Sequence, residues 1–317
     1  MSEKLKIICV VGPTASGKTA LGVRLAEKLG GEIISADSMQ VYMGMPIASA
    51  VPTNEEKCGI PHHLMEFLSP SYQLTVAEYT ELAHKKIKEV SDKGKIPIIV
   101  GGTGLYIDSL VNNIKFTEEV SNTGTREKFE KMYDEAGGEK MLSMLREFDP
   151  DIAGKLYAND KKRIVRAFEI YENTGITMSK QYEFSKTEPS PYDVIFIGIN
   201  YEDREKLYDR INKRVDIMLS NGLLEEAKAF YEKSGKSGGF QAIGHKEFYA
   251  YFNGEITLGE AADRLKQQTR RYAKRQLTWF RKNEKINWIY ADKTEDVLGE
   301  ALKIIERSNK NEGTHIT

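Results

Sequence analysis

The sequence predicts an α/β protein in which a parallel β-sheet core carries a helical insertion domain. Short apolar runs alternate with segments of helical periodicity near the start of the chain, in the order 7–11, 20–29, 32–35, 76–91 and 96–100. This β-α-β-α-β alternation implies a parallel sheet with right-handed crossovers. After residue 114 the pattern is helical, and an apolar run returns only at 194–199. We therefore expect a core in two parts, 1–115 and 192–317, and a helical insertion at 116–191.

The individual elements follow from residue type and period. The runs at 7–11 and 96–100 are continuous and rich in Ile and Val, as in strands that are buried on both faces. Segment 76–91 repeats its apolar residues at helical spacing, and a further helix is expected near Thr103. Beyond the insertion, we expect helices at 204–220 and 258–282 and a last strand at 286–290.

Composition limits the class of protein. Of 317 residues, 40% are hydrophobic and 29% are charged, which is usual for a globular protein. No apolar run approaches the roughly 20 residues of a membrane helix, so we expect no membrane association. The first residues lead directly into a predicted strand, so we expect no signal peptide. Cys9 and Cys58 are the only cysteines, so a disulfide framework is not expected and a reducing cytoplasm fits.

A glycine-flanked segment, GPTASGKT at 12–19, joins the first strand to the first helix and matches the phosphate-binding pattern G-x-x-x-x-G-K-[ST]. Its glycines let backbone amides converge on one point, and the helix start adds partial positive charge. Lys18 offers a cation to phosphate oxygens, and the Thr19 hydroxyl can ligate Mg²⁺. The core is therefore expected to be P-loop NTPase-like. The expected diphosphate ligands in this loop are Gly12, Pro13, Thr14, Ala15, Ser16, Gly17, Lys18 and Thr19.

Two polar residues follow neighbouring predicted strands. Asp37 comes after the second strand, at the edge of the sheet where ligands bind. It can act as a general base or a metal ligand, or it can be a turn or helix N-cap residue. The strand at 96–100 ends in two glycines and Thr103 rather than in an acidic residue. The Thr103 hydroxyl can orient a substrate or cap the next helix. These positions alone do not separate an ATP-dependent kinase from another transferase.

Basic residues are concentrated in one predicted helix. Segment 264–282 contains no acidic residue and eight basic ones: Arg264, Lys266, Arg270, Arg271, Lys274, Arg275, Arg281 and Lys282. Such a stripe is suited to nucleic-acid phosphates, although a solvated charged face is the common alternative. The uncharged positions between them indicate that one side of this helix packs on the core.

The ordered motifs resemble those of one family, the tRNA dimethylallyltransferases. Besides the loop, the chain carries D-S-x-Q-x-Y-x-G-M at 37–45, H-H-L at 62–64, G-G-T-x-L-Y at 101–106, N-D-x-x-R-x-x-R-A at 159–167, Q-A-I-G-x-K-E at 241–247 and T-R-x-Y-A-K-R-Q-x-T-W at 269–279. The loop is common to many families, whereas the full ordered set is specific. It departs from the family at 46–52, which lacks an acidic residue and a lysine, and at His245, which replaces a common aromatic residue.

The resemblance implies transfer of a dimethylallyl group from dimethylallyl diphosphate to the exocyclic amine of adenosine 37 in tRNA, with release of diphosphate. Asp37 would accept the proton of the amine, Thr103 would orient the acceptor, and Thr19 would hold Mg²⁺. Arg214 resembles a family arginine near the diphosphate. The tRNA contacts implied by the resemblance are Asp37, Ser38, Met39, Gln40, Thr103, Lys161, Lys162, Arg163, Ile164, Val165, Arg166, Phe240, Gln241, Ala242, Ile243, Gly244 and His245.

Three other functions remain open from the sequence: an adenylate isopentenyltransferase, a small-molecule kinase and a nucleotide-gated RNA-binding module. The helical insertion and the basic helix favour a large RNA acceptor, so the expected partners are the tRNA anticodon loop and dimethylallyl diphosphate. We expect a monomer. The adjacent His62 and His63 would point to opposite faces of a strand, so we expect packing or hydrogen bonding rather than a shared metal.

Overall fold

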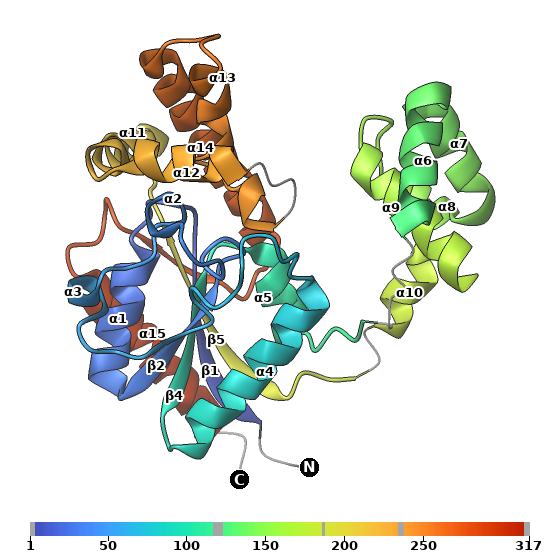
Figure 1. The fold of residues 1–317 in the computed structure, drawn as a ribbon. Coiled ribbons are helices and arrows are strands. Elements are labelled where there is room, and N and C mark those ends of the chain that lie inside the picture. The colour runs from blue at the N-terminus through green and yellow to red at the C-terminus, as the bar shows by residue number, and fades with distance from the viewer. Residues whose placement is uncertain (1–3, 117–122, 186–187, 234–237, 314–317) are drawn as a thin grey trace. The chain divides into compact units, whose positions relative to one another are not determined.

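The fold is given by a computed structural model, which describes residues 4–116, 123–185, 188–233 and 238–313 (Figure 1). In the described residues, six parallel strands form one sheet in the order β3-β2-β4-β1-β5-β6. The strands are β1 (Leu5–Val11), β2 (Gly31–Ala36), β3 (His62–His63), β4 (Ile96–Gly101), β5 (Tyr192–Asn200) and β6 (Asn287–Tyr290). The predicted α/β class is confirmed.

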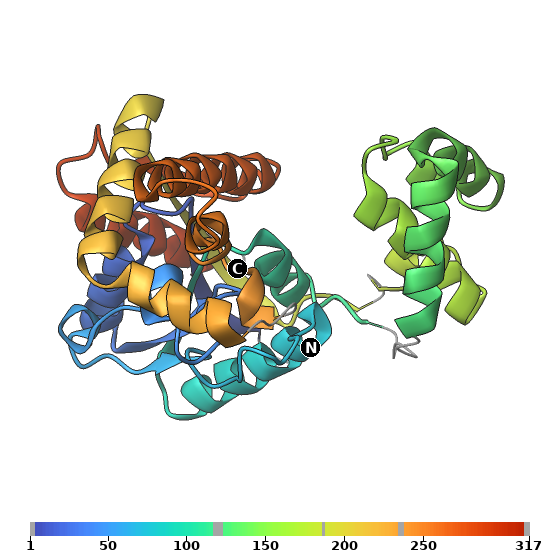
Figure 2. The same cartoon turned by 45° about the horizontal axis from the view of Figure 1, so that its top comes forward.

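Helices cover both faces of this sheet, which explains why its central strands are apolar throughout (Figures 1 and 2). One face packs against α1 (Lys18–Leu29) and α15 (Val297–Gly313). The other packs against α4 (Val76–Asp92), α5 (Gly104–Val111) and the end of α14 (Leu258–Phe280). Side chains of β1 alternate between these two cores.

The sheet register brings three loops together at one edge. Val11 of β1 is paired with Gly101 of β4, and Gly101 is also paired with Ala36 of β2. The segments that follow these strands therefore start side by side, although they are far apart in sequence. They are the three motif segments that begin at 12, 37 and 102.

The part of the chain that forms the sheet contains further elements, which are short except for two helices. They are α2 (Pro46–Ser49), α3 (Asn54–Lys57), α11 (Arg204–Ser220), α12 (Leu223–Lys233), α13 (Tyr249–Phe252) and the 3₁₀ turns η1 (Gly238–Gln241) and η2 (Lys246–Phe248). The loop expected at 46–52 thus begins with a helical turn. A glycine- and serine-rich loop that the sequence predicts at 234–239 lies largely outside the described residues.

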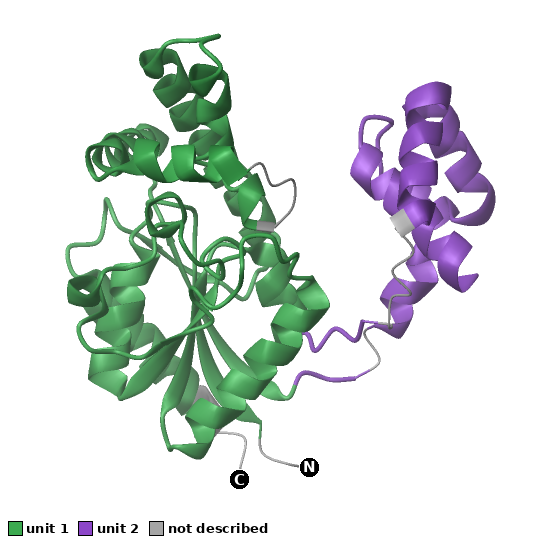
Figure 3. Ribbon diagram, in the orientation of Figure 1, with its two compact units in different colours: residues 1–111, 191–317 green, residues 112–190 purple. Residues whose placement is uncertain are grey.

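The chain divides into two compact units, residues 1–111 with 191–317 and residues 112–190 (Figure 3). The domain boundaries expected at 115 and 191 lie close to these. The second unit consists of α6 (Thr123–Ala136), α7 (Gly138–Phe148), α8 (Pro150–Ala153), α9 (Lys161–Thr174) and α10 (Met178–Phe184). It has its own apolar core, which includes Phe129, Leu145 and Phe168. Across the described part of the chain, the helices are too short or too polar to cross a membrane.

A buried carboxylate ties the start of β2 to its neighbours. The Glu32 carboxylate, with 3% of its side chain exposed, lies 2.7 Å from Lys95 Nζ, 2.7 Å from His63 Nε2 and 3.4 Å from Lys93 Nζ. Burial alone would raise the pKa of Glu32, but the hydrogen bonds from Lys95, His63 and Lys93 lower the pKa to about 2. Since this is below the unfolded value of 4.5, the stabilisation is present above pH 4.5 and is lost as the pH falls towards 2.

Replacing Glu32 by Gln should therefore destabilise the protein at pH 7 by about 2 kcal/mol, because three donors lose a charged acceptor. This expected loss of stability is smaller than that for a fully buried ion pair, because the side chains of Lys93 and Lys95 are 53% and 42% exposed. Urea unfolding at pH 7 and pH 3 measures the effect, and the difference between variant and parent should shrink at pH 3. Asp92→Asn, which removes an exposed pair with Lys88, is the matched control. An equal loss at both pH values would contradict the assignment.

Candidate active site

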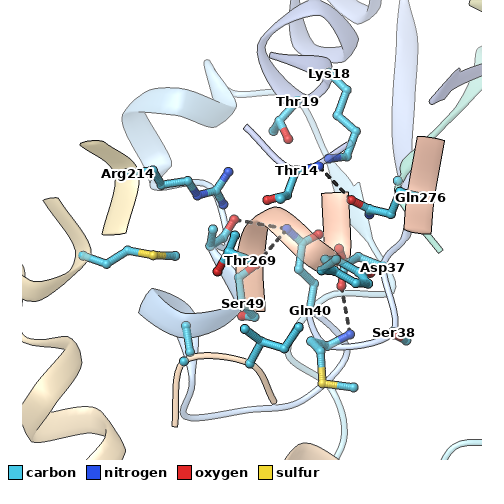
Figure 4. Close-up of a pocket in the computed structure, with 18 of the residues that line it drawn as sticks. Thr14, Lys18, Thr19, Asp37, Ser38, Gln40, Ser49, Arg214, Thr269 and Gln276 are labelled. Carbon is cyan, nitrogen blue, oxygen red and sulfur yellow. Dashed lines mark hydrogen bonds between the residues drawn. The ribbon is translucent and has the colours of Figure 1, made fainter. Parts of the chain in front are cut away.

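A cavity of about 290 Å³ lies at the edge of the sheet where β1, β2 and β4 end (Figure 4). Its walls come from the segments that follow β1 and β2, from α2, and from α11 and α14. Many of the residues that line it are polar, among them Thr14, Lys18, Thr19, Asp37, Ser38, Gln40, Arg214, Thr269, Tyr272, Arg275 and Gln276. The structure thus brings together residues predicted from two separate motifs and from α11.

The glycine-flanked loop has the backbone conformation that its sequence predicts. Gly12 and Gly17 have φ of +152° and +99°, and a Cβ on Gly12 would lie 2.4 Å from the carbonyl oxygen of Ile199. Helix α1 starts at Lys18 without a side-chain cap. The Ser16 hydroxyl is buried and has no hydrogen-bond partner among the described residues. A buried hydroxyl and an uncapped helix start both fit a bound phosphate group.

Two basic side chains that line the cavity, Lys18 and Arg214, lose solvation there. Burial lowers the pKa of Lys18 to about 8, an effect that Asp37 opposes and Arg214 reinforces. Burial likewise lowers the pKa of Arg214, again opposed by Asp37. The hydrogen bond from Lys18 Nζ runs to the carbonyl oxygen of Pro13, at 3.2 Å. A multiply charged anion between these two side chains would compensate for the lost solvation, which is the requirement of a diphosphate site.

Asp37 occupies a turn, as one of its expected roles requires, and it also faces the cavity. Its Oδ1 accepts a hydrogen bond from the Met39 amide at 2.9 Å, so it closes a turn, and it also lines the cavity. Thr103, expected to orient the acceptor, is not among the residues that line the cavity. Its hydroxyl accepts a hydrogen bond from the Ser38 amide at 3.0 Å, while its own amide donates to Ala36. Thr103 therefore fixes the segment that carries Asp37.

The residues present can hold Mg²⁺. This ion takes oxygen ligands and is usually bound by one or two protein groups together with substrate phosphates. Thr19 and Asp37 supply a hydroxyl and a carboxylate in the same cavity. No group of three or more His, Cys, Asp or Glu side chains forms a metal site within the described ranges. The two adjacent histidines contact different groups: His62 Nδ1 contacts the Ile60 carbonyl, and His63 Nε2 contacts Glu32.

Sequence reasoning missed Gln276 as a site residue. From α14, its Oε1 accepts from the Thr14 amide at 2.8 Å and its Nε2 donates to the carbonyl of Gly102 at 3.0 Å. A Cβ on Gly102 would lie 2.1 Å from this Nε2, so the glycine is required for the contact. Gln276 thereby joins the two glycine-containing loops. It shares one cavity-lining face of α14 with Leu265, Thr269 and Tyr272, and this spacing of four, three and four was the available signal.

Besides Asp37 and Thr103, the residues expected to contact tRNA in the core divide into two groups. Those that line the cavity are Ser38, Met39, Gln40, Gln241, Ile243 and Gly244. Phe240, Ala242 and His245 instead have buried side chains that pack inside the core. His245 is fully buried and lies 2.8 Å from Glu226. The contact expected from these three residues is therefore not available to their side chains.

In the second unit, the expected tRNA contacts are also only partly at the surface. Lys162 and Arg163 are exposed on α9. Ile164 and Val165 pack in the helical core, because the helix turns them away from solvent, so their side chains are not available for the expected contact. Lys161 pairs with Asp134 and Arg166 pairs with Glu169, which leaves both partly neutralised.

The basic stripe of α14 is mainly solvent-exposed. Six of its residues are exposed: Arg264, Arg271, Lys274, Arg275, Arg281 and Lys282. Lys266 pairs with Asp216, and Arg270 donates to Asn212. The helix ends at Phe280, two residues before the predicted end. One edge of the stripe reaches the cavity at Arg275.

Comparison with known proteins identifies the family of this chain. The IPP transferase family model matches residues 40–283. A tRNA dimethylallyltransferase of Caldanaerobacter subterraneus is 45% identical, over 94% of this chain and 96% of that protein. One of Acetivibrio thermocellus is 47% identical, over 90% and 92%.

Solved structures give the same result. The tRNA isopentenylpyrophosphate transferase of Bacillus halodurans superposes with a TM-score of 0.70 at 40% identity, over 98% of this chain and 96% of that one. A eukaryotic dimethylallyltransferase acting on tRNA superposes with a TM-score of 0.80 at 32% identity, over 95% and 78%. The sheet is thus that of the P-loop NTPase-like isopentenyltransferases. Fold, site and sequence together show that this chain belongs to the IPP transferase family, alongside the tRNA dimethylallyltransferases.

Proposed function

We propose that this protein transfers a dimethylallyl group from dimethylallyl diphosphate to the exocyclic amine of adenosine 37 in tRNA and releases diphosphate. The observation that carries the proposal is the combination, in one cavity, of two desolvated cations, Lys18 and Arg214, with one carboxylate, Asp37. The names of the relatives given above supply the donor and acceptor class.

The chemistry explains why this combination is needed. The amine of adenine is a weak nucleophile, so catalysis depends on stabilising the leaving diphosphate and on positioning the amine. As the C–N bond forms and the allylic C–O bond breaks, Lys18 and Arg214 stabilise the diphosphate oxygens. Asp37 accepts the proton that the amine loses. Mg²⁺, held by Thr19, would add positive charge at the same diphosphate.

The RNA is recognised through charge and through the exposed base. A base that reacts must leave the stacked anticodon loop and enter the cavity. The exposed residues of the basic stripe on α14, together with Lys162 and Arg163, would neutralise backbone phosphates. Ser38, Met39 and Gly244 would contact the inserted nucleotide at the cavity wall.

A transfer assay tests the proposal. Purified protein, Mg²⁺ and labelled dimethylallyl diphosphate are mixed with unmodified tRNA that has three adenosines beside the anticodon, and in parallel with AMP. We expect label in the tRNA, mapped to adenosine 37, and none in AMP. Label in AMP alone would assign the free-nucleotide reaction instead. No label in either, with ATP consumed in the presence of a small acceptor, would assign a kinase.

A further inference from the structure

We infer that Glu226 on α12, supported by His245, is a positioning residue for the tRNA acceptor. It holds the wall of the cavity formed by residues 48–50 and 244–246, and this inference rests on the proposed function. Ser49 lies at the opposite end of the view from Lys18 and Thr19 (Figure 4). This wall therefore faces the nucleotide, rather than the diphosphate, in the inferred complex.

Glu226 caps a helix far from it in sequence. Its Oε2 accepts from the Ile47 amide at 2.8 Å and its Oε1 from the Ala48 amide at 2.9 Å. Both amides belong to the first turn of α2, where no intrahelical acceptor exists. Pro46 contributes no amide hydrogen, and Met45 provides no side-chain cap. The carboxylate thus satisfies the two donors that this helix start exposes.

His245 fixes the carboxylate from the other side. Its Nε2 lies 2.8 Å from Glu226 Oε1, and its ring packs on Phe230 with centroids 4.4 Å apart. Because the ionised carboxylate only accepts, Nε2 must carry the hydrogen. The other ring nitrogen, Nδ1, is buried without a partner in the part of the chain that the structure describes. The pair therefore holds one ring orientation and one carboxylate orientation.

The capped helix reaches the cavity through direct contacts. Ala48, Ser49 and Ala50 line it. Gln40 Nε2 donates to the carbonyls of Ser49 at 3.3 Å and Ala50 at 3.1 Å, which couples α2 to the segment that follows Asp37. Gly244 lies so close that a Cβ on it would be 3.0 Å from that of Ala48. A shift of α2 therefore moves three cavity-lining segments together.

Replacing Glu226 by Gln keeps the size but places an amide donor against a backbone donor. We expect the KM for tRNA to rise about tenfold, while the Kd for dimethylallyl diphosphate changes by less than about twofold. Hydrogen exchange should accelerate at the amides of Ile47 and Ala48. Glu225→Gln, an exposed neighbour on α12, is the matched control and should change none of these.

A second pair of variants separates positioning from folding. His245→Gln retains a donor near the position of Nε2 and should keep most of the parental KM, whereas His245→Phe retains the ring but loses the donor and should raise it. Equal losses in tRNA and donor binding with a lower Tm, or an unchanged KM for tRNA in Glu226→Gln, would overturn the inference. If the parent transfers no label to tRNA, the proposed function fails. RNA affinity and exchange at Ile47 and Ala48 then decide the role of Glu226 alone.

Discussion

Replacing Asp37 by Asn is expected to lower kcat for dimethylallyl transfer by about 10²–10⁴-fold, the usual contribution of a positioned general base. Asn keeps a side-chain oxygen that can accept the hydrogen bond from the Met39 amide, so the turn is retained. Binding of dimethylallyl diphosphate should be unchanged or tighter, since a negative charge is removed beside Lys18 and Arg214. Single-turnover kinetics with labelled donor, together with separate donor and RNA affinities, measure these effects.

A comparison with Asp37→Ala distinguishes the two roles of this residue. Ala loses both the base and the turn. If the carboxylate acts as the base, the Asn variant should be nearly as slow as the Ala variant, while only Ala weakens RNA binding. An Asn variant with most of the parental kcat would show that Asp37 is a turn residue, and the base would have to be sought elsewhere in the cavity.

The core of the fold could be predicted because its signals are local. Continuous apolar runs such as 7–11 and 96–100 need helices on both faces, and the intervening helical periods supply them. The short elements could not be predicted in this way. Strand β3 (His62–His63) has only two residues and helix α2 (Pro46–Ser49) only four, which is too few for a period. They form because neighbours complete their hydrogen bonds, as Glu226 does for α2.

The residues of the candidate site also differ in whether a local sequence motif or tertiary packing places them there. Lys18 and Asp37 lie in contiguous motifs that follow strands, so sequence alone places them at one edge of the sheet. The spacing along α14 marks only the helix face that carries Gln276, and where that face crosses the sheet edge is set by packing. The opposite error occurs in α9, where Ile164 lies inside a motif expected to contact RNA but is buried by the packing of its helix. A motif marks a segment, whereas packing decides which of its side chains reach a ligand.

The affinity for dimethylallyl diphosphate is expected to fall as the pH rises above about 8. Burial lowers the pKa of Lys18 to about 8, so this side chain increasingly loses its charge above that pH. The bound diphosphate favours the charged form and raises the pKa of Lys18, so that binding above pH 8 takes up a proton. By linkage, Kd should increase by up to tenfold per pH unit between the pKa values of the free and the bound protein. Calorimetry in buffers of different ionisation enthalpy measures the proton uptake directly.

Lys18→Arg and Lys18→Met provide the controls for this dependence. Arg stays charged, so its Kd should be nearly independent of pH over this range, and any remaining slope belongs to the donor or to other groups. Met removes the charge at every pH, and at pH 7 its Kd should be about 10–100-fold weaker than that of the parent, as for loss of a charge-assisted hydrogen bond. The parent and the Met variant should therefore converge at high pH. Parallel pH profiles for parent and Lys18→Arg would show that the Lys18 ammonium does not set the affinity, and the diphosphate would then depend on Arg214 and the loop amides.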